Sequence, residues 1–139
     1  MRPGICLRVL LVALAFAAPA CTSATSPAAT LTITTPPDFS GSVAKAELES
    51  GNGPAGPYAQ YDLWVIVPPA PTANAGVVVP NSAPVFLRRG SSLVTSRASE
   101  IRVGDRIDVW RDPILVAYGA VQGPAGAPTY SGTQIVIVR

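Results

Sequence analysis

The sequence predicts an all-β protein that folds as one small barrel of five to six strands. Its apolar segments are short and rich in valine and isoleucine, and 15 prolines and 12 glycines are spread over 139 residues. No stretch keeps the apolar spacing of three and four residues that a helix needs, so short paired strands are expected. Periodicity does not fix the strand order, so an SH3-like barrel and a β-sandwich remain alternatives.

The strands are predicted from alternating apolar and polar residues and from the prolines and glycines that end each segment. Ala44, Ala46 and Leu48 alternate with charged residues, as on a strand with one face in water. The range 62–67 is apolar on both faces and ends at two prolines, which predicts a central strand. Other strand segments are expected at 77–79, 85–87, 107–109, 114–117 and 134–138, a helical turn at 96–101, and loops at 51–57, 69–76 and 123–128.

The first twenty residues have the composition of a cleavable signal peptide. Arg2 and Arg8 accompany an apolar run over 9–18, and small residues lead to Ala20 and Cys21. The run is about half of the ~20 residues that a membrane-spanning helix requires. We therefore expect cleavage after Ala20 and no permanent span.

The cleavage region resembles the lipobox of bacterial lipoproteins, which usually reads leucine, alanine or serine, glycine or alanine, and then the modified cysteine. Ala20 and Cys21 match this pattern, whereas Ala18 and Pro19 depart from it. The resemblance implies that Cys21 is acylated and anchors the mature protein in a membrane, which two or three acyl chains do almost permanently. Thr22 implies the outer membrane in a Gram-negative cell. Plain secretion with the same mature start is the alternative.

Processing would leave a lipid-anchored flexible tether at 21–37 and a barrel domain at 38–139. The tether is rich in serine, threonine, alanine and proline. Two of the ten basic residues leave with the signal peptide, so the mature chain has eight basic against eight acidic residues. This neutral balance gives no support to a nucleic-acid partner. Cys6 also leaves, so no intramolecular disulfide is expected.

The residue types argue against an enzyme and against a metal or other cofactor. The chain has no histidine, the commonest general base and metal ligand. Ser42 and Lys45 have the spacing of penicillin-binding serine enzymes, but they lie in an alternating β segment instead of at a helix start. Asp105, Asp108 and Asp112 lack the spacing of a calcium loop and neighbour arginines. We expect no catalytic and no metal-binding residues.

A binding face is the one functional feature that the sequence suggests. Aromatic and arginine side chains on one side of a barrel can stack on and clamp an envelope glycan, a peptide or an anionic lipid. The residues that would form this face are Tyr58, Tyr61, Trp64, Arg102, Arg106 and Trp110. The interpretation that we favour instead places Trp64 in the core and pairs the arginines with nearby carboxylates.

Three segments carry a resemblance to a known family: Ser99-Glu100-Ile101, the segment VGDRIDVW at 103–110, and a closing strand at 134–137. Together they resemble the C-terminal half of small bacterial lipoproteins with a YobA-like domain. This chain departs from them over 117–122, where Gly119 replaces a proline and Gln122 comes one residue late. The resemblance implies a five-stranded OB-type barrel and brings no known activity. We expect an exported envelope lipoprotein with a non-enzymatic structural or interaction role and an envelope protein or glycan as its partner.

Overall fold

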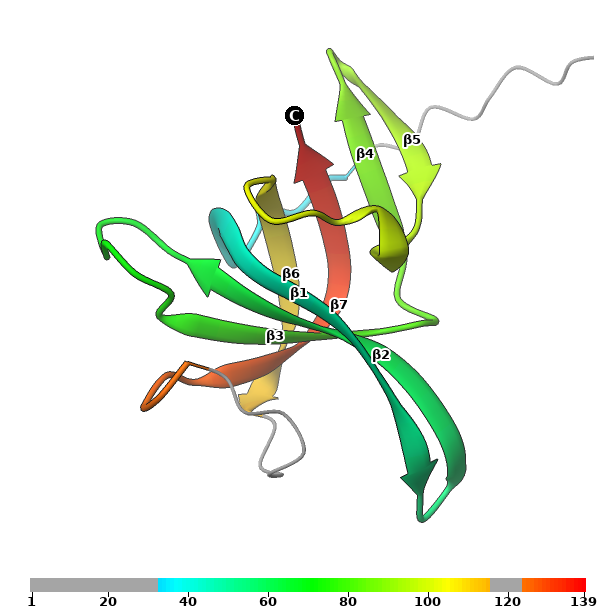
Figure 1. Cartoon of the computed structure of the whole chain (residues 1–139). Coiled ribbons are helices and arrows are strands. Elements are labelled where there is room, and N and C mark those ends of the chain that lie inside the picture. Colours follow the sequence, from blue (N-terminus) through cyan, green and yellow to red (C-terminus); the bar gives the residue numbers. More distant parts are fainter. Residues whose placement is uncertain (1–32, 116–123) are drawn as a thin grey trace, which may run out of the picture.

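The computed structural model describes residues 33–115 and 124–139 and shows an all-β fold, as predicted (Figure 1). Within these ranges the only helical element is a short 3-10 turn, and no helix is long and apolar enough to cross a membrane. The elements are β1 (Phe39–Gly53), β2 (Gly56–Ile66), β3 (Ala75–Pro80), β4 (Val85–Arg89), β5 (Ser92–Ser96), the 3-10 turn (Ala98–Glu100), β6 (Arg106–Leu115) and β7 (Thr129–Val138).

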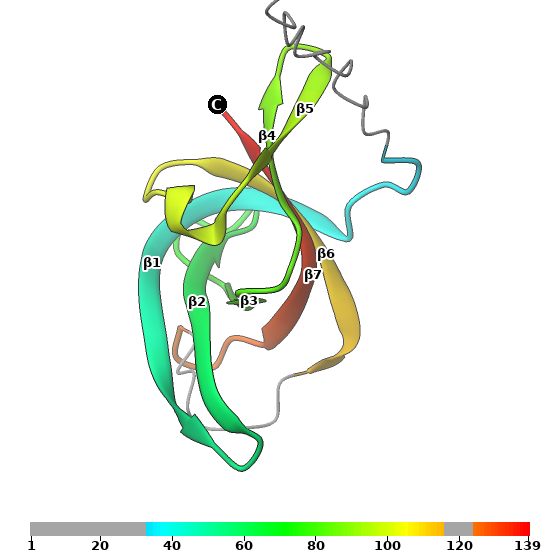
Figure 2. The same ribbon diagram turned by 90° about the vertical axis from the view of Figure 1, so that its right-hand side faces the viewer.

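The seven strands form one sheet, and five of them close into a barrel-like ring (Figure 2). The sheet order is β3-β2-β1-β6-β7-β4-β5, and parallel pairing of β3 with β7 closes the ring. All other pairs within the ring are antiparallel. This is the strand order of an OB barrel, with the β4–β5 hairpin and the 3-10 turn inserted between its third and fourth strands.

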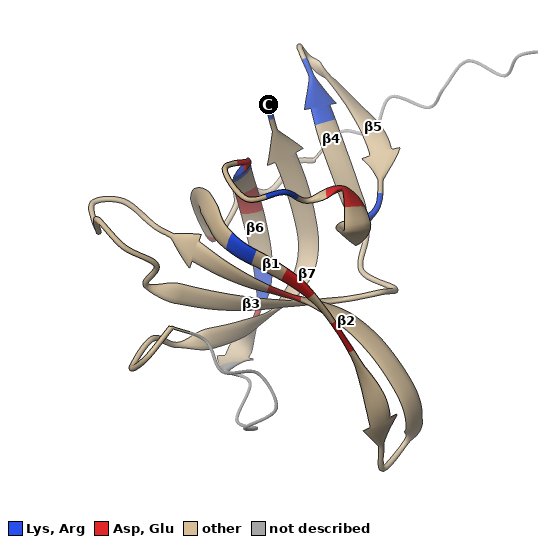
Figure 3. Ribbon diagram, viewed as in Figure 1, with Lys and Arg blue, Asp and Glu red and all other residues tan. Residues whose placement is uncertain are grey.

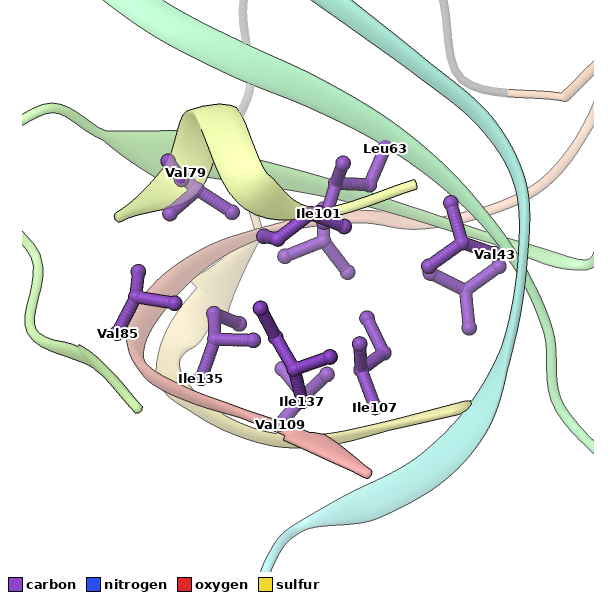
Figure 4. Packing of buried hydrophobic residues seen from close by; sticks show 12 residues of the cluster. Val43, Leu63, Val79, Val85, Ile101, Ile107, Val109, Ile135 and Ile137 are labelled. Carbon is purple, nitrogen blue, oxygen red and sulfur yellow. The ribbon is translucent and has the colours of Figure 1, made fainter. Parts of the chain in front are cut away.

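The core lies inside the ring and is built almost entirely from aliphatic side chains (Figure 4). Alternate residues of each ring strand point inward, as the two-residue period of a strand requires. Leu63 and Val65 of β2 are fully buried, which agrees with the central strand predicted over 62–67. Ala98 and Ile101, at the 3-10 turn predicted within 96–101, belong to the same buried cluster.

The β1–β2 hairpin projects beyond the ring, and we call its residues 47–62 the arm (Figure 1). The sequence predicted a loop over 51–57, and this prediction was wrong. β1 continues to Gly53 and β2 begins at Gly56, so only two residues connect the strands. Gly56 has a φ of +110°, a conformation that glycine adopts without steric cost, and this freedom permits the tight reversal.

The β4–β5 hairpin also differs from the prediction, because no strand was expected over 92–96. Gly90 and Ser91 form a two-residue turn, and Gly90 has the positive φ of +60° expected at the first position of a type II′ turn. The two segments predicted at 107–109 and 114–117 lie on one irregular strand, β6, as far as it is described, and its register shifts between Trp110 and Arg111 and again between Arg111 and Leu115. Residues 116 and 117 lie outside the described ranges.

Candidate functional site

β5 is an open edge of the sheet. It pairs with β4 on one side and has no strand neighbour on the other among the described residues. Because bonded and non-bonded pairs alternate in an antiparallel ladder, the N–H and C=O groups of every second β5 residue point away from β4. The strand reads Ser-Leu-Val-Thr-Ser and carries neither a charge nor a proline, the devices that commonly blunt an edge. Such an edge can accept another strand.

A groove of about 650 Å³ lies against the β4–β5 hairpin near its turn, and Leu93 is the β5 residue that lines it. One wall is the segment 33–37, which leads into β1, and the other is the β4–β5 hairpin with Arg88 and Leu93. Trp110 of β6 also lines the groove, and its Nε1 donates a hydrogen bond to the backbone oxygen of Thr35 at 3.1 Å. The groove thus combines apolar surface from Leu93 and Trp110 with the charged Arg88, and it meets the open edge at Leu93.

A buried carboxylate holds Arg88 in place at the groove. Asp108 is only 7% exposed and accepts hydrogen bonds from Ser40 Oγ at 2.6 Å and from Arg88 Nη2 at 3.1 Å. These three residues come from β1, β4 and β6, so the contact ties the inserted hairpin to the ring. No buried side-chain nitrogen or oxygen in the described part of the chain lacks a hydrogen-bond partner.

Arginines flank the β5 edge at both ends. Arg89 precedes the β4–β5 turn and Arg97 follows β5, and both are exposed. Neither has an ion pair or a side-chain hydrogen bond with a residue in the described ranges. Figure 3 shows basic residues on β4 and at the end of β5. The edge strand is therefore uncharged and has an exposed arginine near each end, while Glu100 accepts a hydrogen bond from Ser96 at its C-terminal end.

The carboxylates that the sequence paired with arginines have partners, but not all the expected ones. Asp108 binds Arg88, and Asp105 binds the C-terminal Arg139 with a shortest N–O distance of 2.8 Å. The hydrogen bond from Arg139 holds the pKa of Asp105 below its usual value. Arg102 and Arg106 are both exposed and form no ion pair within the described ranges.

The structure does not bring the six predicted face residues together. Tyr58 and Trp64 share one face of the β1–β2 hairpin, and Tyr61, whose parity in β2 is opposite, packs against the core. Trp110 lines the groove beside β5. Arg102 lies between the 3-10 turn and β6, and Arg106 begins β6. Trp64 is only half-buried outside the core cluster, so its predicted core position was wrong.

The arm carries an acidic and amide cluster next to Tyr58. Gln60 Nε2 lies 3.2 Å from Glu49 Oε2 and 3.4 Å from Asp62 Oδ1, and Tyr58 OH lies 3.4 Å from Glu49 Oε1. Partial burial and the neighbouring Glu49 raise the pKa of Asp62 to about 7. On the same face the Lys45 ammonium lies 2.9 Å from Glu47 Oε2 and 4.7 Å from the centre of a Trp64 ring.

The described residues contain no group of three or more histidine, cysteine or acidic side chains placed to hold a metal ion. Ser42 and Lys45 both lie on β1, with a register shift between Val43 and Lys45, so their spacing is that of a bulged strand. Cys21, the predicted signal peptide and most of the predicted tether lie outside the described residues. Comparisons with protein-family models, curated proteins and solved structures found no match to this chain.

Proposed function

We propose that this protein is an exported envelope lipoprotein whose barrel domain has a non-enzymatic interaction role. Acylation of Cys21 would anchor it, and the β5 edge with its groove would bind an extended polypeptide segment of an envelope partner. The observation that supports this role is the open, uncharged edge strand, which meets a partly apolar groove at Leu93. Strand addition of this kind draws affinity from backbone hydrogen bonds and specificity from pockets for alternate side chains.

The chemistry of the site favours a polypeptide over other ligands. Unpaired N–H and C=O groups at a regular spacing complement another peptide backbone, which neither a lipid nor a glycan reproduces. Leu93 and Trp110 give the groove an apolar lining on which a side chain of the incoming strand can pack. Arg89 and Arg97 favour an acidic residue near either end of that segment.

The proposed anchor sets how far this site reaches. Eleven residues, 22–32, would separate an acylated Cys21 from Ile33 at the groove. The twelve steps from Cys21 to Ile33 span at most about 40 Å when the chain is extended. The domain would therefore meet partners close to the membrane surface. Mass spectrometry of the mature protein from cells tests the anchor: acylated Cys21 supports it, and an unmodified N-terminus at Cys21 refutes lipidation while leaving export intact.

A matched pair of variants tests the binding role. Arg89 and Ser92 flank the two-residue turn and form a hydrogen-bonded pair. Hydrogen-bonded and non-hydrogen-bonded pairs alternate along the hairpin, so Thr95 is in a non-hydrogen-bonded pair and its N–H points away from β4. We would select peptides against the full chain carrying Cys21→Ser and measure their Kd values. Thr95→Pro, which removes that N–H, is expected to weaken binding about tenfold, whereas Thr95→Ala keeps it. Equal Kd values for both variants would contradict strand addition at β5.

A second candidate function is glycan binding on the outer face of β2. The strand 2–3 face of OB barrels can bind oligosaccharides, and this face carries Tyr58, Gln60, Asp62 and Trp64. Its carboxylates disfavour anionic polymers and suit neutral sugars. Screening the same Cys21→Ser chain against a glycan panel tests it. Binding that is lost in Tyr58→Ala and retained in Thr95→Pro would support this function over the first.

A further inference from the structure

The arm provides a second open strand edge. β1 pairs with β6 only through residues 39–42, and beyond Lys45 its strand partners all come from β2. Residues 45–53 of β1 are thus unpaired on the side away from β2 within the described structure. This stretch is longer than the five residues of β5. A molecule with two open edges can pair one with the other in a neighbouring copy.

The two edges have opposite charge. In residues 45–62, Glu47 is paired with Lys45, and Glu49 carries a further negative charge. Asp62, with a pKa of about 7, is partly ionised near neutral pH, so this edge is weakly acidic. Around β5, Arg89 and Arg97 are exposed and have no ion pair in the described residues. Arg88 is paired with Asp108, and Glu100 accepts a hydrogen bond from Ser96 at the end of the strand. Figure 3 shows acidic residues on the β1–β2 hairpin and basic residues on the β4–β5 hairpin. Opposite charges on two surfaces steer their encounter and disfavour pairing of either edge with itself.

Each edge also exposes an apolar side chain that pairing would cover. Leu48 in the arm is 60% exposed, and Val94 in β5 is 47% exposed. Leu48 is exposed because the arm extends past the core cluster. Apolar residues on unpaired strands are the usual sign of an edge that receives a partner.

From these observations we propose that the strand received by β5 is the acidic arm edge of a second copy of this chain. This inference rests on the proposed function of β5 as an interaction edge and names its partner. Within one chain β1 and β5 are not paired, and the tips of their hairpins point to opposite ends of the domain in both views (Figures 1 and 2). Only the start of the arm approaches β5, where Leu48 and Tyr61 line a hollow with Ser96. Pairing along the two edges is therefore a contact between molecules. A reciprocal pair of arm-to-β5 contacts would give a closed dimer.

Charge reversal provides a test that does not depend on any other ligand. The full chain carrying Cys21→Ser, which cannot be acylated, would be studied by sedimentation velocity over a range of concentrations at low salt. We expect reversible self-association that added salt weakens. The variant Arg89→Glu/Arg97→Glu and the variant Glu47→Lys/Glu49→Lys each oppose like charges, and each should raise the dissociation constant about tenfold or more.

Mixing these two variants restores both complementary contacts, so the mixture should associate as the parent chain does. Combining all four substitutions in one chain should also restore association. Recovery in either case shows that the variants are folded. A parent chain that remains monomeric, or reversed variants that associate as tightly as the parent, would overturn the inference. If the parent chain is monomeric but binds peptides that Thr95→Pro does not bind, the inference of self-association fails and the proposed function stands. If the parent chain neither associates nor binds any peptide, the inference and the proposed function both fail.

Discussion

At the scale of single residues, Gly41 sets how closely β1 and β2 approach. A Cβ built at this position would lie 2.5 Å from the backbone oxygen of Ile66 and 2.5 Å from Cγ1 of Val65. The first of these is a backbone atom, which cannot move away as the end of a flexible side chain can. A glycine inside a strand is a recognised sign of such close approach. Gly41 is therefore required by packing within the ring.

Gly41→Ala is expected to lower the free energy of unfolding by about 1–3 kcal/mol, because the added methyl group overpacks the β1–β2 contact. Urea denaturation of the variant and the parent measures this change. Ser42→Ala, at the exposed next position of the same strand, is the matched control and should leave the midpoint nearly unchanged. An unchanged midpoint for Gly41→Ala would show that β1 can move away from β2.

Alternation in the sequence predicted which small aliphatic residues are buried, but it did not place the tryptophan. Over 62–67 every position is apolar after Asp62, so two opposite assignments of inward faces fit equally well. The structure puts Leu63 and Val65 inside the ring and Trp64 outside under Lys45. Which face of β2 points inward depends on how β1 pairs with β2, including the register shift before Lys45. The residues of β2 alone do not determine that pairing.

At the scale of elements, the arm contains a protonation equilibrium near neutral pH. Asp62 has a usual pKa of 3.8 and, in the fold, a pKa of about 7, because it is partly buried and faces Glu49. Glu47 acts in the same direction, and the Gln60 amide acts against it. The folded protein therefore retains a proton here that the unfolded chain releases at lower pH.

The stability that this protonation contributes is fully present below pH 3.8 and is lost as the pH rises through about 7. Asp62→Asn cannot ionise, so the variant should lose less stability than the parent between pH 4 and 8. Thermal unfolding at several pH values measures the difference, with Asp112→Asn, a substitution on β6, as the control. Parallel stability profiles for Asp62→Asn and the parent would contradict the assignment.

The elements that the sequence did not predict are those that form the proposed site. β5 has two serines and a threonine among its five residues, and this polar composition does not predict a strand. The distal arm has glycines at 51 and 53, which indicated a loop. In both cases pairing across a two-residue turn outweighs weak intrinsic preference. Gly90-Ser91 between two apolar stretches was the one local signal for the β4–β5 hairpin.

At the scale of the whole molecule, the OB strand order depends on contacts between distant segments. β3 and β7 close the ring through residues 76–78 and 129–131, far apart along the chain. Gly132 supports this closure, because a Cβ there would lie 3.2 Å from Val77 Cγ1 and from Ile135 Cδ1. The short segments indicated a barrel or a sandwich, and only this long-range parallel pairing distinguishes them.

β5 lies outside the ring and is an uncovered edge of the sheet. Hydrogen–deuterium exchange of the Cys21→Ser chain directly tests whether β5 is open in one molecule and pairs with the arm of another. In dilute solution the outward-pointing amides of β5 should exchange much faster than those of β6 and β7. At high concentration and low salt, β5 and residues 45–53 of β1 should gain protection together, while β6 and β7 remain unchanged. Uniform protection of β5 in dilute solution, or no concentration-dependent change in either edge, would contradict the account.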